Sequence, residues 1–321
     1  MTSTIAAAEM RTAAVVLLDA LDEQQRAQAA LSFDDDAARR WLEYRPERRP
    51  GACLALMSPA GRKAAHVLLA TALSDHAFAQ AMVITALEEV LDLREQRALH
   101  RHSGDYWVSV FGDPAAGDAW SWRFEGHHLS VTMTVVGDEV SPAPVFLGAN
   151  PACVSYAGRP VSRPLAPEED LGRAFLDALE PAGRALAVVA DRAPYDVRSA
   201  TAARASRLEP LGVSASSVGP TARAVLDQVV ALYLDRLTPS LAAQEAERLA
   251  SSGGELHFAW EGPLTPATRH YYRVQGEDLL IEYDNTQDDG NHQHTVLRRP
   301  ASDFGADILA AHHGQAHAQA T

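Results

Sequence analysis

The order in which the hydrophobic spacing changes along the chain is the strongest constraint on its fold. Apolar residues recur at helical intervals of three and four over residues 1–100 and again over residues 168–250. Residues 105–150 and 255–300 instead hold short runs of strand-forming residues, separated by turns rich in Gly, Pro and Asp. Because these segments are grouped and do not alternate as βαβ units, the pattern predicts an α+β fold with mainly antiparallel sheet.

We expect the two strand clusters to form one sheet or two facing sheets, packed with the N-terminal and central helices. The chain has 321 residues, 47% of them hydrophobic and 22% charged, so it can bury an adequate core without a disulfide or a structural metal. We therefore expect a single compact domain over residues 1–321, with residues 312–321 as a loose tail.

Charge and composition exclude several classes of protein. The formal net charge is −14 and the basic residues are scattered, which disfavours nucleic-acid binding. No apolar run is long enough for a membrane helix, and residues 1–10 lack the basic cluster of a signal peptide. Cys53 and Cys153 lie far apart, as in a cytoplasmic protein without disulfides. We expect a small-molecule substrate and no membrane partner. The sequence carries no signal for the oligomeric state.

Common catalytic motifs are missing. The chain contains no GxGxxG, P-loop, GxSxG, HExxH or CxxC pattern. Nucleotide-phosphate binding, the hydrolase nucleophile elbow and the commonest zinc-protease helix therefore have no support in the sequence.

Two histidine groups stand out, one in each strand cluster. His292 and His294 are two residues apart in a predicted strand, so their side chains share one face at a spacing of roughly 7 Å. His127 and His128 begin another strand and point to opposite faces unless Gly126 introduces a bulge. In regular geometry only one of these two can join the same site, and the sequence does not show which.

Clustered imidazoles predict a transition-metal site. Histidine nitrogens suit copper, iron or zinc and argue against magnesium or calcium. Asp284 and Asn285, at the end of the preceding strand, could orient the imidazole rings by hydrogen bonds. The alternative is that both are ordinary turn residues.

Charged residues close to the histidines are candidates for catalysis. We expect Glu125 to act as a general base and Arg123 to receive a substrate carboxylate. Arg298 and Arg299 could do the same, although surface salt bridges explain all three arginines equally well.

The N-terminal helices are expected to be scaffold. They have continuous apolar faces, and His66 and His76 are their only candidate ligands. We expect neither of them to bind metal.

Several segments resemble a known protein family, the domain-of-unknown-function family catalogued under the number 3500. The resemblance rests on Trp120–Ser130, Phe146–Pro151, Tyr283–Gln287, Asn291–His294 and the Trp41–Arg62 region with Met57-Ser58-Pro59. It covers most of the chain and implies that the His-His and His-x-His segments belong together as signatures of one metal site. It implies no activity, because the family is one of unknown function.

The sequence thus predicts a metal-dependent enzyme with one ion of copper, iron or zinc in a mononuclear, histidine-rich site. The scarcity of carboxylates among the candidate ligands favours an iron- or copper-dependent oxidoreductase acting on a small organic substrate. A zinc-dependent hydrolase or lyase is the alternative, since Glu125 could serve a metal-bound water. A non-catalytic metal- or ligand-binding protein is the second alternative.

Overall fold

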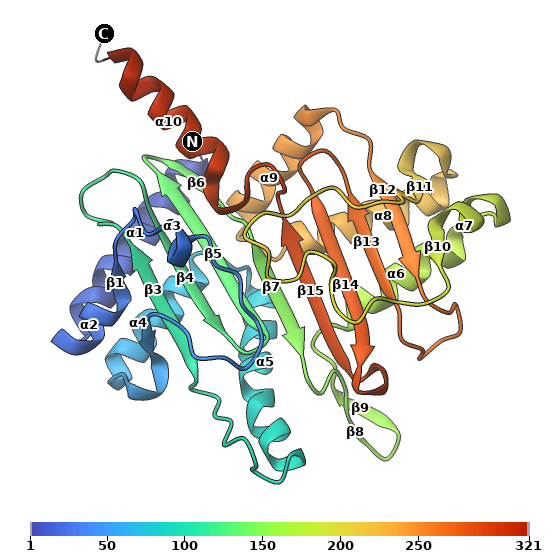
Figure 1. Cartoon of the computed structure of the whole chain (residues 1–321), viewed down its shortest axis with the longest axis horizontal. Coiled ribbons are helices and arrows are strands. Elements are labelled where there is room, and N and C mark those ends of the chain that lie inside the picture. The colour runs from blue at the N-terminus through green and yellow to red at the C-terminus, as the bar shows by residue number, and fades with distance from the viewer. Residues whose placement is uncertain (1, 320–321) are drawn as a thin grey trace.

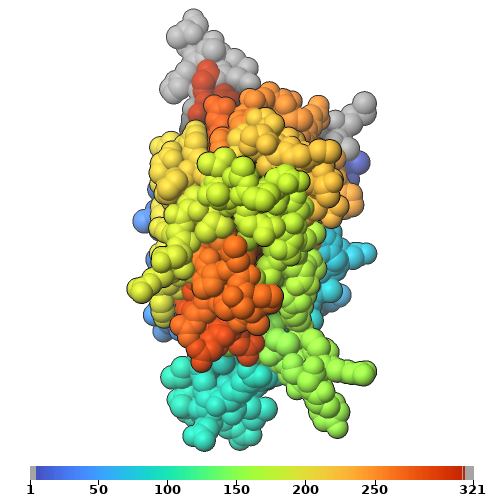
Figure 2. Space-filling view, turned by 90° about the vertical axis from the view of Figure 1, so that its right-hand side faces the viewer, coloured from blue at the N-terminus to red at the C-terminus, as the bar shows by residue number. Residues whose placement is uncertain are grey.

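The protein consists of three layers built on one large sheet. The computed structural model describes residues 2–319. A 13-stranded, mostly antiparallel sheet is covered by helices on one face and by two long loops on the other (Figure 1). We call these loops the first strap (residues 32–51) and the second strap (residues 191–212). Figure 2 shows orange residues of the sheet between green residues of the helical layer and yellow-green residues of the second strap. The α+β prediction is confirmed.

The helices and strands fall largely where the hydrophobic spacing predicted them. The helices are α1 Thr2–Ala20, α2 Glu23–Ala29, α3 Asp36–Arg39, α4 Pro59–Ala70, α5 Asp75–Arg94, α6 Ala166–Ala178, α7 Pro181–Ala187, α8 Pro220–Leu234, α9 Pro239–Ser252 and α10 Ala306–Gln319, with 3-10 turns η1 Leu54–Leu56, η2 Ala215–Ser217, η3 Asp288–Gly290 and η4 Asp303–Gly305. The strands are β1 Ala30–Leu31, β2 Ala52–Cys53, β3 Tyr106–Phe111, β4 Trp120–Gly126, β5 Leu129–Val136, β6 Glu139–Ser141, β7 Val145–Ala149, β8 Val154–Tyr156, β9 Arg159–Ser162, β10 Val188–Ala190, β11 Val213–Ser214, β12 His257–Glu261, β13 Tyr271–Gln275, β14 Leu280–Gln287 and β15 His292–Arg298.

The C-terminal tail differs from the expectation. Residues 312–319, predicted as loose, continue helix α10 away from the body (Figure 1). Five of the 14 residues of α10 are alanine, the best helix former, which favours the helical state of this element. Ala320 and Thr321 lie outside the described residues. No described helix has both the length and the apolar character needed to cross a bilayer.

The two halves of the chain repeat one arrangement of elements. In the first half, β1 pairs in parallel with β3 and β2 pairs antiparallel with it, before the antiparallel run β3, β4, β5 and β7. In the second half, β10 and β11 pair with β12 in the same two ways, before β12, β13, β14 and β15. In each half, two helices precede the strap and two follow it. The sheet is therefore an internal duplication, with β7 and β15 joining the halves at its centre.

Matching details in the two halves support the duplication. Each strap ends at a glycine with positive φ, Gly51 or Gly212. A Cβ atom would lie 2.6 Å from a backbone oxygen of β3 at Gly51 and 2.0 Å from one of β12 at Gly212, so neither position accepts a side chain. Arg26 donates from Nε to the carbonyl of Leu18, and Arg184 in the second half donates from Nε to the carbonyl of Leu176.

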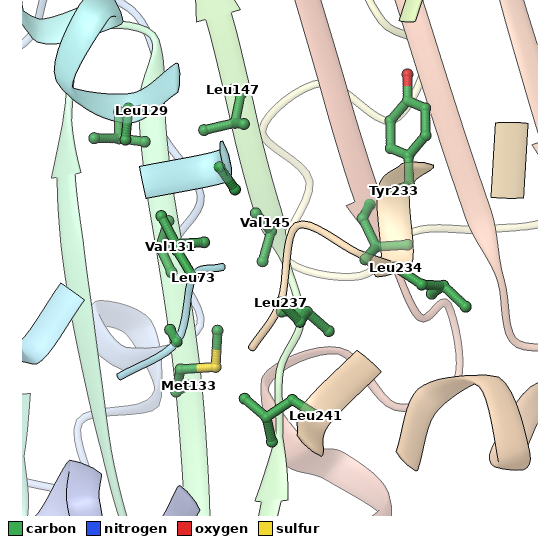
Figure 3. Packing of buried hydrophobic residues seen from close by; sticks show 14 of the residues in the cluster. Leu73, Leu129, Val131, Met133, Val145, Leu147, Tyr233, Leu234, Leu237 and Leu241 are labelled. Carbon is green, nitrogen blue, oxygen red and sulfur yellow. The ribbon is translucent and has the colours of Figure 1, made fainter. Parts of the chain in front are cut away.

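The halves also meet in the helical layer, between α4 and α5 and between α8 and α9. Leu73 and Leu237 form an isolated antiparallel bridge. Figure 3 shows both side chains in the buried cluster against Val131, Met133 and Val145 of the sheet. The apolar core thus lies between the helices and the sheet and runs across both halves.

The strap-facing side of the sheet is largely polar but buried. Charged side chains on the sheet hold the backbones of the straps: Arg123 donates to the Ala38 and Trp41 carbonyls, and Glu282 accepts from the Arg198 amide. The straps thereby bury these charges and at the same time supply hydrogen-bond partners for them.

Candidate metal centre

The candidate site lies at one end of the sheet, where the turn between β4 and β5 meets the start of β15. His127 and His128 form this two-residue turn, and His128 has a φ of 62°. Histidine is among the residues that tolerate this left-handed conformation. The prediction that the two begin a strand and face opposite sides is therefore corrected. In the turn, strand alternation does not apply, and the rings stack with their centroids 3.7 Å apart.

Strand β15 places the second histidine pair. His292 and His294 lie on the strap-facing side of the sheet, with ring centroids 4.7 Å apart. Gln293 between them points toward the helices, where its Nε2 donates to the Tyr283 hydroxyl and to Glu169 at 2.9 Å. The alternation predicted for this strand is present in the structure.

Three imidazoles converge on one point. The Nε2 atoms of His128 and His292 are 2.8 Å apart, and one ligand atom each of His128, His292 and His294 lies within 4.8 Å of the others. Ligand nitrogens on a tetrahedral ion with bonds of about 2.0 to 2.1 Å lie roughly 3.3 Å from one another. All three side chains are buried. The three nitrogens therefore fit a single ion after small adjustments.

Carboxylates behind the rings fix their orientation. His292 Nδ1 lies 3.0 Å from Asp288, and His294 Nδ1 lies 2.9 Å from Asp196 and 3.3 Å from Asp284. A proton held on Nδ1 by a carboxylate leaves the Nε2 lone pair free for a metal. Two of the three imidazoles are thus presented in the tautomer that binds a metal through Nε2.

The environment also sets the charge of each ring. Burial, together with the neighbouring imidazoles, lowers the pKa of His128 well below its ordinary value. Burial and the charge of His294 lower the pKa of His292 to about 3. Burial alone would lower the pKa of His294, but the carboxylates of Asp284 and Asp196 outweigh this effect and raise the pKa to about 10. Without an ion, the His294 ring is therefore positively charged at neutral pH, with a proton on both nitrogens, while the other two rings are neutral.

Two further groups of possible ligands adjoin this site. Glu88, His127 and His128 form one of them, with Glu88 2.5 Å from His127 Nδ1. The guanidinium of Arg101 lies 3.3 Å from the same nitrogen, and this positive charge opposes a cation there. Asp196, Asp284 and His294 form the other group, but it uses the Nδ1 that orients the His294 ring. The group of His128, His292 and His294 is the best ion site.

The structure places the other residues singled out in the sequence as follows. Asp284 contacts His294, whereas Asn285 accepts a hydrogen bond from the His270 amide, away from the three histidines. Glu125 is ion-paired with Arg123 at 2.7 Å and belongs to none of the three ligand groups. The carboxylate that contacts the His127–His128 turn is Glu88.

The remaining arginine candidates have structural partners. Arg298 pairs with Asp303 at 2.7 Å, and Arg299 pairs with Asp307 at 2.6 Å and with Asp278 at 3.4 Å. Like Arg123, they hold loops against the sheet.

Four acidic residues at the site escaped sequence analysis. Glu88 comes from α5, Asp196 from the second strap, and Asp288 from the β14–β15 turn, and Glu95 pairs with Arg101 beside Glu88. Only Asp288 carries a local signal, since it precedes His292 by four residues in the same hairpin.

Among the residues that the structure describes, the second half of the chain has no copy of the histidine site. The turn equivalent to His127–His128 joins β13 to β14 and holds Glu277 and Asp278. Asp278 pairs there with Arg248 at 3.1 Å and with Arg299 at 3.4 Å. Ion pairs thus surround the β13–β14 turn, whereas histidines surround the equivalent β4–β5 turn at the other end of the sheet.

His66 and His76 provide a test of the scaffold assignment. His66 packs 6.1 Å from the Phe124 ring, and His76 is exposed beside Ser74, so neither belongs to a ligand group. We expect His66→Ala and His76→Ala to leave the metal content unchanged, as measured by elemental analysis of folded, untagged protein. Loss of the ion in either folded variant would contradict the assignment.

Comparison with known proteins identifies the family and no closer relative. Residues 3–306 match the family described as "Protein of unknown function (DUF3500)". No curated protein and no solved structure matches the chain. The match covers nearly the whole chain and agrees with the resemblance seen in the Trp120–Ser130 and Asn291–His294 segments. The chain belongs to the DUF3500 family.

Proposed function

We propose that the protein is a metal-dependent enzyme that binds one transition-metal ion through Nε2 of His128, His292 and His294. The observation that carries the proposal is the convergence of three buried imidazoles, two of them backed by carboxylates at their Nδ1 atoms. Three protein ligands leave a coordination position open, as in catalytic metal sites. The pairing of rings with carboxylates is typical of such sites.

The neighbouring Glu88–His127 pair favours proton-transfer chemistry. A bound ion supplies Lewis acidity and lowers the pKa of a water in the open position. His127 stacks on His128 and shares a short hydrogen bond with Glu88, so this pair is placed to take up a proton beside the ion. These features support a hydrolase or lyase with Glu88 as the base, the role that the sequence suggested for Glu125.

Redox chemistry is the second candidate. Three imidazoles without a carboxylate ligand also suit iron or copper. The carboxylates behind His292 and His294 increase the basicity of these ligands, which stabilises a more highly charged ion. The identity of the resident metal separates the two candidates.

The test is reconstitution of metal-free, untagged protein with zinc, ferrous or cupric ion. Each form is assayed for hydrolysis of a panel of esters and amides and for oxygen uptake with small organic substrates. We expect one metal to give turnover, and Glu88→Gln to keep the ion but lose most of the turnover. Failure to bind any ion, or full turnover in Glu88→Gln, would contradict the proposal as stated.

Metal affinity should rise with pH. The His294 proton, with its pKa raised to about 10, must leave before Nε2 can bind an ion. Below that pKa, the apparent affinity is expected to rise about tenfold per pH unit, because one proton competes with the metal. Competition with a chromophoric chelator between about pH 6.5 and about pH 8.5 measures this slope. A flat profile would show that His294 is not a protonated ligand.

A further inference from the structure

A cavity of about 470 Å³ opens beside the metal centre. Its inner end is formed by Glu88 and His127, the pair next to the three metal-binding imidazoles. Pro46, Leu99 and Trp107 contribute an apolar wall. The cavity therefore joins the candidate centre to a space large enough for a small organic molecule.

The lining of this cavity is formally neutral, whereas the chain as a whole is acidic. Six lining residues are arginine or histidine: Arg48, Arg49, His100, Arg101, His102 and His127. Three are acidic: Glu47, Glu88 and Asp105. The whole chain, by contrast, has a formal net charge of −14. With the histidines neutral, Arg48, Arg49 and Arg101 thus balance the three acidic residues of the lining.

The guanidinium of Arg101 is held in one plane at the cavity lining. Glu95 accepts from its Nε at 2.6 Å and from its Nη2 at 2.9 Å, which fixes the plane of the guanidinium. Its Nη1 lies 3.3 Å from His127 Nδ1 and 3.7 Å from Glu88. Because His127 Nδ1 donates its proton to Glu88, it cannot also accept from Arg101. Nη1 is therefore paired with Glu88 only at 3.7 Å, and it can donate a closer hydrogen bond to an anion in the cavity.

We infer that this cavity binds a small organic acid, with its carboxylate on Arg101 Nη1 and its apolar part against Trp107 and Leu99. A guanidinium held in one plane is the preferred partner of a carboxylate. A free inorganic phosphate shares the anionic chemistry but would leave the apolar wall uncovered. The binding of the acid in this cavity is independent of the proposed function. Only its role as the substrate rests on that proposal.

The test is calorimetric titration of the full-length protein, both metal-free and zinc-loaded. The probes are benzoate, its neutral analogue benzamide, and inorganic phosphate. We expect benzoate to bind both forms of the protein and to bind more tightly than either other probe. Arg101→Gln should weaken benzoate binding about tenfold or more, because it removes the charge-assisted hydrogen bond. Arg101→Lys, which keeps the charge but not the planar fork, should be intermediate.

Matched controls separate this inference from the metal proposal. Arg97→Gln, in the same loop but outside the cavity lining, should bind benzoate like the wild type. Metal content should be unchanged in Arg101→Gln. Equal binding of benzamide and benzoate, tighter binding of phosphate, or unchanged affinity in a folded Arg101→Gln protein would overturn the inference. Benzoate binding that depends on Arg101 in a protein unable to bind metal would instead overturn the proposed function alone.

Discussion

His292→Ala and His294→Ala proteins should fold normally and lose most of their bound metal. Each change removes one of three converging imidazoles, while the backbone hydrogen bonds of β15 to β7 and β14 remain. Loss of an outer partner alone typically weakens metal binding 10- to 100-fold, so the loss of a direct ligand should exceed about 100-fold. Elemental analysis and competition titration of untagged protein measure the effect.

Gln293→Ala is the matched control for this experiment. Gln293 lies between the two histidines but points to the helical side of the sheet, where it contacts Tyr283. Its replacement should leave the metal content unchanged. Retention of a full equivalent of metal by both histidine variants would refute the ion site, and a loss in Gln293→Ala alone would refute the placement of the strand.

Arg236→Ala should be among the most destabilising substitutions in the chain. Arg236 is fully buried, and its Nη2 donates to Glu168 and to the Thr295 hydroxyl, both at 2.8 Å. Removing the guanidinium leaves the Glu168 carboxylate buried without its charge partner. Breaking a buried pair in this way costs about 3 to 5 kcal/mol in the free energy of unfolding. Denaturant unfolding measures the difference.

A double variant and an exposed arginine serve as controls. Replacing both partners, as Arg236→Met with Glu168→Leu, removes both buried charges and should recover most of the lost stability. Arg223→Ala removes an exposed ion pair with Asp227 and should change the free energy of unfolding by less than about 1 kcal/mol. Equal effects of Arg236→Ala and Arg223→Ala would show that the buried pair does not have the role described.

Local spacing was sufficient to predict the classes of element but not the duplication that organises them. The strand clusters at 105–150 and 255–300 follow from alternation and turn residues, which act locally. The sequence does not reveal the duplication, because equivalent positions in the two halves have the same place in the strands and turns but carry different side chains. Gly126 and Gly276 close equivalent strands, for example, yet His127–His128 follows one and Glu277–Asp278 the other.

The histidine site was predictable only where one strand supplies two of its members. His292 and His294 share a face because strand geometry requires it. The predicted side-chain directions of His127 and His128 were wrong, because the residues of a two-residue turn need not follow the alternation of a strand. The sequence alone did not show the left-handed φ at His128. Glu88 and Asp196 approach from a distant helix and from a strap, so no spacing along the chain links them to the histidines.

The most direct measurement of the central claim is an anomalous diffraction map from crystals of untagged, full-length protein, collected at the absorption edge of the metal found by elemental analysis. The account predicts one peak between His128, His292 and His294, with three metal–nitrogen bonds of about 2.0 to 2.1 Å. A peak at any other group of residues, or protein without a stoichiometric ion that binds none on reconstitution, would contradict it.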